Sequence, residues 1–274
     1  MDHWLQPRRL LLALLITLIV LFLVFPILVV IPMGFTSSES LSFPPRGFST
    51  RWYERLIFEP NWRNSLFNSL QVAFGTVATS LAVGVPLALS LMRGRFPGQQ
   101  LLSAFVITPL VMPTLIVAIG VFYTWSIGWA IGPFRFGSRL TGSALGLILA
   151  HTALAIPMVV VLSTAGLRTV DRTFELAAAG LGANPWNCFW TITFPLMLPG
   201  IAGAAVFAFL TSWDEAIVSL FLTNANFQTF PVRMFLQVRE AVDPSVAAAA
   251  TILIALTTAL FTVSLLSRAR GTAQ

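Results

Sequence analysis

Two neighbouring carboxylates, Asp214 and Glu215, stand inside a long apolar stretch of the sequence. They lie about fifteen residues after Pro199, where a membrane-crossing helix would begin. An ionised acid at the centre of such a helix costs roughly 2.5–3.5 kcal/mol, so acids of this kind usually face a bundle interior or a water-filled path. An aromatic neighbour adds a face for a cation. The stretch therefore predicts a path for a cationic solute, lined by Asp214, Glu215, Trp213, Ser212 and Thr211.

A structural role is the alternative for the same acids, with their oxygens bonded to arginine or to backbone at a helix end or a subunit interface. His151 lies in another apolar stretch and is predicted to be a core histidine with satisfied hydrogen bonds rather than a proton relay. The chain has two histidines and one cysteine, Cys188, which argue against a zinc site and against a nucleophile–base cluster. We therefore expect no metal site and no catalytic residues.

The composition is that of a membrane protein. Of the 274 residues, 57% are hydrophobic and 9% are charged, whereas soluble domains have roughly 45–50% apolar and about 25% charged residues. The sixteen basic residues are all arginine, so the chain has no lysine for a phosphate-binding P-loop or a Schiff base. Any ATP chemistry must come from another chain. The net charge of +6 does not indicate nucleic acid on so apolar a chain.

Six stretches are long enough, at about 20 apolar residues, to cross a bilayer as helices. The first has an apolar run longer than the ~7–15 residues of a cleavable signal peptide, so we expect it to remain as an anchor. An even number of spans puts both termini on one side of the membrane. The predicted ranges are Leu10–Ile31, Ser69–Met92, Leu101–Tyr123, Ser143–Ala165, Gly200–Leu222 and Val246–Leu266.

Pairs of arginines lie at the span ends that are on the same side of the membrane as the two termini. Because positive charge is enriched on the cytoplasmic side, both termini are predicted to be cytoplasmic. The opposite loops also contain arginine, but at lower density. The pairs are Arg8/Arg9, Arg93/Arg95, Arg168/Arg172 and Arg268/Arg270.

The resulting organisation has an external loop, 34–67, rich in aromatics and arginine, which suits an amphipathic segment at the outer interface. Its tryptophans, Trp52 and Trp62, are typical of headgroup depth. The predicted regions are a cytoplasmic tail 1–9, an anchor helix 10–33, the external loop 34–67, a core 68–266 and a cytoplasmic tail 267–274.

One cytoplasmic loop within the core, 166–198, has its own helix signals. Asp171 can cap a short helix that runs through Ala179 and ends at Gly182. Asn184 offers a second cap, with a proline at the first helical position, so a second short helix is predicted over Asn184–Ile192. From the residues alone, a docking role and a self-packed loop are equally open.

The stretch Glu175-Leu-Ala-Ala-Ala-Gly-Leu-Gly182, followed by Ile192-Thr-Phe-Pro195, resembles the EAA loop of ABC importer permeases. In that family the loop docks into the ATP-binding subunit and transmits its closure. The resemblance implies that role for Leu176, Ala177, Ala178, Gly182, Ile192 and Pro195. Glu175 lies one residue early, about 100° around a helix from the usual position. We therefore expect the loop to couple to an ATPase but leave the role of Glu175 open.

Further stretches, Arg51–Ser90, Thr108–Gly120 and Phe230–Ile254, are similar to the second permease subunit of the spermidine/putrescine-type branch. The resemblance implies a type I ABC importer permease fold, all-α with six transmembrane helices, in the bacterial inner membrane. It also implies a heteromeric complex with a second homologous permease, two ATP-binding subunits that hold ATP and Mg²⁺, and an external solute-binding protein. This chain would be noncatalytic and bind no cofactor.

The expected solute is a polyamine or a related amine, with another small organic solute of the same branch as the alternative. A different class, an ATP-independent secondary transporter or channel, also remains open at this point. It would need no ATPase partner, so co-purification of an ATP-binding chain separates the two.

Overall fold

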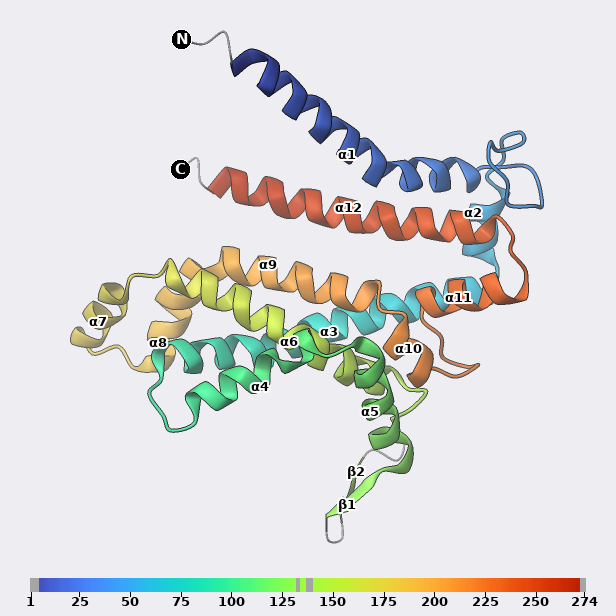
Figure 1. Cartoon of the computed structure of the whole chain (residues 1–274). Helices are drawn as coiled ribbons and strands as arrows, with labels where there is room; N and C mark the ends of the chain where they lie inside the picture. Colours follow the sequence, from blue (N-terminus) through green and yellow to red (C-terminus); the bar gives the residue numbers. More distant parts are fainter. Residues whose placement is uncertain (1–4, 132–133, 137–139, 272–274) are drawn as a thin grey trace. The chain divides into compact units, whose positions relative to one another are not determined.

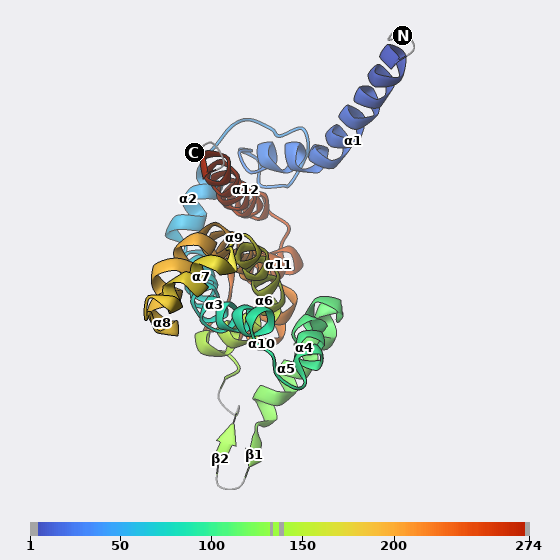
Figure 2. The same cartoon turned by 90° about the vertical axis from the view of Figure 1, so that its left-hand side faces the viewer.

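The computed structural model describes residues 5–131, 134–136 and 140–271, and it is almost wholly helical (Figure 1). An all-α membrane protein is confirmed apart from one short antiparallel hairpin, which extends beyond α5 in both views (Figures 1 and 2). Residues 1–4 and 272–274 of the predicted tails lie outside the described residues. In chain order the elements are α1 (Leu5–Met33), α2 (Arg51–Phe58), α3 (Pro60–Arg93), α4 (Gln99–Val111), α5 (Thr114–Ile127), β1 (Trp129–Ile131), β2 (Phe134–Phe136), α6 (Ala144–Arg168), α7 (Arg172–Gly180), α8 (Pro185–Cys188), the π-helical turn η1 (Phe189–Thr193), α9 (Phe194–Trp213), α10 (Ile217–Leu222), α11 (Phe230–Glu240) and α12 (Ser245–Gly271).

Candidate membrane spans overlap all six predicted ranges. Within the described residues, five helical segments are long and apolar enough to cross a membrane, and the bent pair α4 and α5 makes a sixth if it is counted as one span. The single segments are Arg9–Met33, Pro60–Arg93, Ala144–Arg168, Pro185–Trp213 and Ser245–Leu266.

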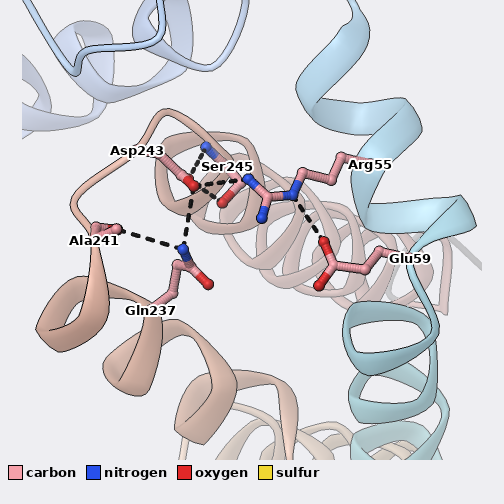
Figure 3. A network of polar contacts seen from close by, with 6 residues as sticks. All are labelled: Arg55, Glu59, Gln237, Ala241, Asp243 and Ser245. Carbon is pink, nitrogen blue, oxygen red and sulfur yellow. Dashed lines mark hydrogen bonds and ion pairs between the residues drawn. The ribbon is translucent and has the colours of Figure 1, made fainter.

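The chain divides into two compact units. The smaller unit holds Met1–Arg63 and Met234–Ala255, and the larger holds Asn64–Arg233 and Leu256–Gln274. The polar network in the smaller unit centres on Asp243 (Figure 3). Asp243 accepts from Arg55 Nη1 at 2.7 Å and from the Ser245 backbone N–H at 2.9 Å, the latter at the start of α12. The network thus joins α2 to the turn before α12.

Arg55 holds a second carboxylate in the same network. Its Nε donates to Glu59 Oε2 at 2.8 Å, and this hydrogen bond, with the neighbouring charge of Asp243, raises the pKa of the guanidinium (Figure 3). Gln237 Nε2 donates to Asp243 Oδ2 at 3.1 Å. Ion pairs that remain partly exposed contribute only about 0.2–1 kcal/mol each. The network therefore fixes geometry more than it adds stability.

Helix α2 is the amphipathic segment predicted for the external loop, with Trp52 and Leu56 buried and Phe58 exposed. Trp52 Nε1 donates to the Thr36 carbonyl at 2.9 Å, and Trp62 is also buried. These two tryptophans are therefore core residues of the smaller unit, and their depth in the membrane stays a prediction. The indole N–H of Trp52 thus has the hydrogen-bond partner that a buried tryptophan usually needs.

The core of the larger unit is the pair α6 and α9, which lie side by side (Figure 1). Small residues permit the close approach: a Cβ built on Gly200 would stand 2.7 Å from the Gly166 Cα. Buried Ala155, Ala204 and Ala208 continue the same seam. Small residues at a helix interface let backbones come close enough for dispersion to hold them in a membrane.

The third predicted span, Leu101–Tyr123, is not one straight helix. It breaks at Met112 and Pro113, where α4 and α5 meet at 106°. Proline lacks an N–H and forces the preceding residue towards extended backbone, and Met112 has ψ 138°. The third candidate span is therefore a bent pair of helices joined at Met112 and Pro113.

The fifth predicted span, Gly200–Leu222, is also interrupted. Helix α9 ends at Trp213, Asp214 is its C-cap, and the short helix α10 begins at Ile217. Helices α5 and α10 pack together, with Ala118 and Val218 fully buried in one cluster. The helices that follow the two breaks, α5 and α10, therefore pack against each other. The apolar pattern of the sequence does not reveal this contact.

Candidate functional site

The caps predicted for the 166–198 loop are confirmed. The Asp171 carboxylate accepts from the Thr173 N–H at 2.9 Å, and this hydrogen bond holds the pKa of Asp171 below its usual value. Gly182 follows α7 at φ +87°, a conformation that glycine adopts without strain. Asn184 Oδ1 accepts from the Asn187 N–H at 2.7 Å at the start of α8. Local chemistry thus folds the loop into two short helical segments (Figure 1).

The second loop helix is not separate from the membrane helix, which corrects the predicted range Asn184–Ile192. Helix α8 runs through η1 into α9 as one segment, Pro185–Trp213. The wider turn accounts for the continuity, because the Phe194 N–H bonds to the Phe189 carbonyl, five residues back. Pro195, which has no N–H to donate, then falls within the first turn of α9.

An apolar groove of about 450 Å³ opens between α7 and the η1–α9 segment. It contains four of the predicted coupling residues, Ala177, Ala178, Ile192 and Pro195. The other four lining residues were not identified from the sequence. Two of them had a signal in the sequence, because Phe174 and Leu181 are spaced around Ala177 and Ala178 so that these side chains share one face of a helix. The groove is lined by Phe174, Ala177, Ala178, Leu181, Thr191, Ile192, Pro195 and Leu196.

The other predicted coupling residues take different positions. Leu176 is exposed, and Gly182 terminates α7. Glu175 turns inward: its Oε2 lies 3.4 Å from Arg93 Nε, and its Oε1 accepts from Thr193 Oγ1 at 3.0 Å. Arg93 is the last residue of α3, and it also donates to the Val170 carbonyl at 3.2 Å. Glu175 therefore ties α7 to α3 and η1, with its carboxylate directed away from the groove.

The predicted acid pair lies at the break between α9 and α10. Asp214 is exposed, while Glu215 is half-buried and its Oε1 accepts from the Val218 N–H at 2.8 Å. That bond satisfies one of the free amides at the start of α10, as a helix cap does. Among the described residues, neither acid forms an ion pair with arginine. Glu215 thus bonds to backbone at a helix start, as the structural alternative has it, while the Asp214 side chain is exposed on this chain.

The three residues before the acids point elsewhere. Trp213 is 1% exposed and stacks with Phe209 and Phe230 at centroid distances of 5.7 and 6.4 Å. Thr211 Oγ1 donates to the Phe207 carbonyl at 2.8 Å. Ser212 is buried. The structure therefore brings Asp214 and Glu215 together at the break but places Trp213 in the core, where a solute cannot reach its ring.

His151 contacts the same break from α6. It is fully buried, and its Nδ1 lies 2.8 Å from Ser212 Oγ and its Nε2 3.1 Å from Ser219 Oγ. The prediction of a core histidine with satisfied hydrogen bonds is confirmed. Its partners were missed because they stand 61 and 68 residues away in the sequence. Among the described residues, no group of three histidine, cysteine, aspartate or glutamate side chains could hold a metal ion.

Comparison with known families adds the decisive observation. Residues 80–270 match the family described as binding-protein-dependent transport system inner membrane component. The chain belongs to this family. It is thus an inner-membrane component of a transport system that depends on a binding protein, and it is an ABC importer permease subunit. Such permeases are noncatalytic, and separate subunits hydrolyse ATP.

Relatives within the family carry several solute names. The chain is 31% identical to a putrescine transport system permease of Escherichia coli (strain K12) over 235 residues, covering 85% of this chain and 82% of the relative. It is 30% identical to a spermidine/putrescine transport system permease of Haemophilus influenzae, with coverage of 89% and 90%. A molybdenum transport system permease of Mycobacterium bovis is also 30% identical, with coverage of 75% and 79%.

A solved bacterial ABC transporter for import of the polysaccharide alginate has a subunit of the same fold. The TM-score is 0.72 at 15% identity, with 98% of each chain covered. At this identity the likeness concerns the fold. The type I importer permease fold predicted from the EAA-like loop is therefore confirmed.

Proposed function

We propose that this permease forms half of the translocation path for a small cationic solute, such as putrescine or spermidine. The observation that carries the proposal is the acid pair at the α9–α10 break, with an exposed Asp214 that has no arginine partner among the described residues. A carboxylate at such a break attracts an ammonium group and repels an anion such as molybdate. The names of the polyamine relatives support the same solute class. Another small organic solute of the branch is the alternative.

The proposed assembly is a second homologous permease, two ATP-binding subunits that hold ATP and Mg²⁺, and an external solute-binding protein. The groove beside α7 supports docking of an ATP-binding subunit, because exposed apolar surface of this kind marks protein contacts. We place both termini in the cytoplasm, on the basis of the arginine pairs at the span ends. The groove then opens on the cytoplasmic side.

The test of the solute path is Asp214→Asn, measured as putrescine uptake by the reconstituted complex. Removing the charge keeps the shape of the side chain, so we expect uptake to fall about tenfold, equivalent to about 1.4 kcal/mol. The amount of assembled complex should not change. Glu39→Gln, at an exposed acid in the 34–67 loop, is the matched control and should leave uptake unchanged. Full uptake by Asp214→Asn would refute the role of the acid in the path.

A further inference from the structure

One imidazole bridges the two sides of the α9–α10 break. Ser212 lies in the last turn of α9, Ser219 lies in α10, and the two ring nitrogens of His151 bond one serine each. All three side chains are buried. The bridge therefore joins the two ends of the segment that contains Asp214 and Glu215, through a residue of α6, which does not itself contain the acids.

The hydrogen-bond chain has a direction. Thr76 Oγ1, on α3, donates to Ser212 Oγ at 3.5 Å. The Ser212 hydroxyl is then free to donate to His151 Nδ1, and a neutral imidazole that accepts at Nδ1 donates from Nε2 to Ser219. Each group in the chain thus uses a donor and an acceptor that match its neighbour. Helices α3, α6, α9 and α10 meet at this one chain.

Helix α10 has only six residues, so few hydrogen bonds of its own fix its orientation. Its position depends on packing against α5 through Val218 and Leu222, on the bond from Glu215, and on the bond from Ser219 to His151. Of these, the His151 bridge also reaches α9, so it sets the angle between the two helices.

We propose that His151 is a positioning residue that holds the α9–α10 break in the shape that presents Asp214 and Glu215. The link to transport rests on the proposed solute path. The geometric part, that His151 sets the shape of the break, stands on the two serine contacts and is tested separately.

The geometric test measures a distance across the break. Spin labels replace the exposed Leu198 on α9 and Leu220 on α10, in a Cys188→Ser background of the assembled complex. We expect His151→Leu, which keeps bulk but makes no hydrogen bond, to broaden and shift the distance distribution. His151→Gln, whose amide both donates and accepts, should restore much of it. Identical distributions in the wild type and His151→Leu would overturn the proposal.

A milder variant covers the case in which His151→Leu does not assemble. Ser219→Ala removes one bond of the bridge and leaves the ring in place, so it should broaden the same distribution to a lesser extent. Asp214→Asn is the matched control, because its side chain is outside the bridge and should leave the distribution unchanged. An unchanged distribution in Ser219→Ala would also count against the bridge.

The transport test uses the same variants. We expect His151→Leu, which removes both hydrogen bonds of the bridge, to raise the KM of putrescine uptake about tenfold, with a smaller change in kcat. His151→Gln should recover most of the KM. The two proposals can fail separately. If His151→Leu shifts the distance distribution but Asp214→Asn keeps full uptake, His151 is supported as the positioning residue and the solute path is refuted. An unchanged KM in His151→Leu, when Asp214→Asn does lose uptake, would overturn the link between bridge and acids.

Discussion

The two ends of the continuous helical segment Pro185–Trp213 treat acidic and apolar side chains in opposite ways. Beside the loop end, Glu175 turns inward to Arg93, while Leu181 of the groove is 91% exposed. At the other end, Trp213 is buried and Asp214 is exposed. Exposed apolar surface suits a protein partner, whereas an exposed carboxylate suits water and cations. The same helical segment thus connects two surfaces with different chemical preferences.

Of the two surfaces, the groove is where a single substitution has the largest expected effect. Ala178→Arg places a charge in the groove, and an uncompensated charge at a buried interface costs about 2–5 kcal/mol. We expect co-purification of the ATP-binding subunit to fall more than tenfold, measured on the complex extracted from membranes. Ala179→Arg, on an exposed position of α7 outside the groove, is the control. Equal loss in both variants would mean that charge near α7, not the groove, matters.

The inward acid has a smaller expected effect, on stability rather than on transport. Glu175→Gln removes a partly buried ion pair with Arg93 and should lower the free energy of unfolding by about 1 kcal/mol. A double-mutant cycle with Arg93→Gln, measured by thermal denaturation of the complex, isolates the pair. The KM of putrescine uptake should stay unchanged, the reverse of the result expected for Asp214→Asn. A raised KM in Glu175→Gln would remove the contrast between the two acids.

The smallest effect concerns the cap of α7, which is exposed to solvent. Because the folded pKa of Asp171 is depressed, the cap contributes fully above the ordinary aspartate pKa of 3.8 and is lost as pH falls below it. A spin label on the exposed Arg172 position should therefore gain mobility only at acidic pH. Asp171→Asn, which caps equally well without titrating, should remove the pH dependence. Mobility that rises equally in both would assign the change to other acids.

Local chemistry accounts for what the sequence predicted well. Asp171, Gly182 and Asn184 act on amides or backbone angles within three residues of themselves, so their pattern is sufficient to place the helix ends. The apolar spans were equally visible, since the bilayer sets their length. Both parts of the prediction depend on near neighbours or on composition.

The missed features depend on contacts between distant residues. The end of α9 at Trp213 was not predicted because the following Ile217–Leu222 is as apolar as the helix before it. What interrupts the helix is stabilised from α6, through His151. Likewise, Glu175 could be seen to be out of register, but its partner Arg93 lies 82 residues earlier. Contacts between residues so far apart leave no periodic pattern in the sequence.

The π-helical turn η1 affects how the loop end of the segment Pro185–Trp213 is rotated relative to its membrane end. A π turn accommodates one more residue than an α turn, and one residue corresponds to about 100° of rotation. The extra residue therefore sets the rotational phase of the loop relative to the membrane helix, without a break in the backbone. With the phase set at this turn, the orientation of the groove is fixed independently of α9, whose small residues face α6. The π turn therefore sets the rotation between the groove, which we propose as a docking surface, and the face of α9 that packs on α6.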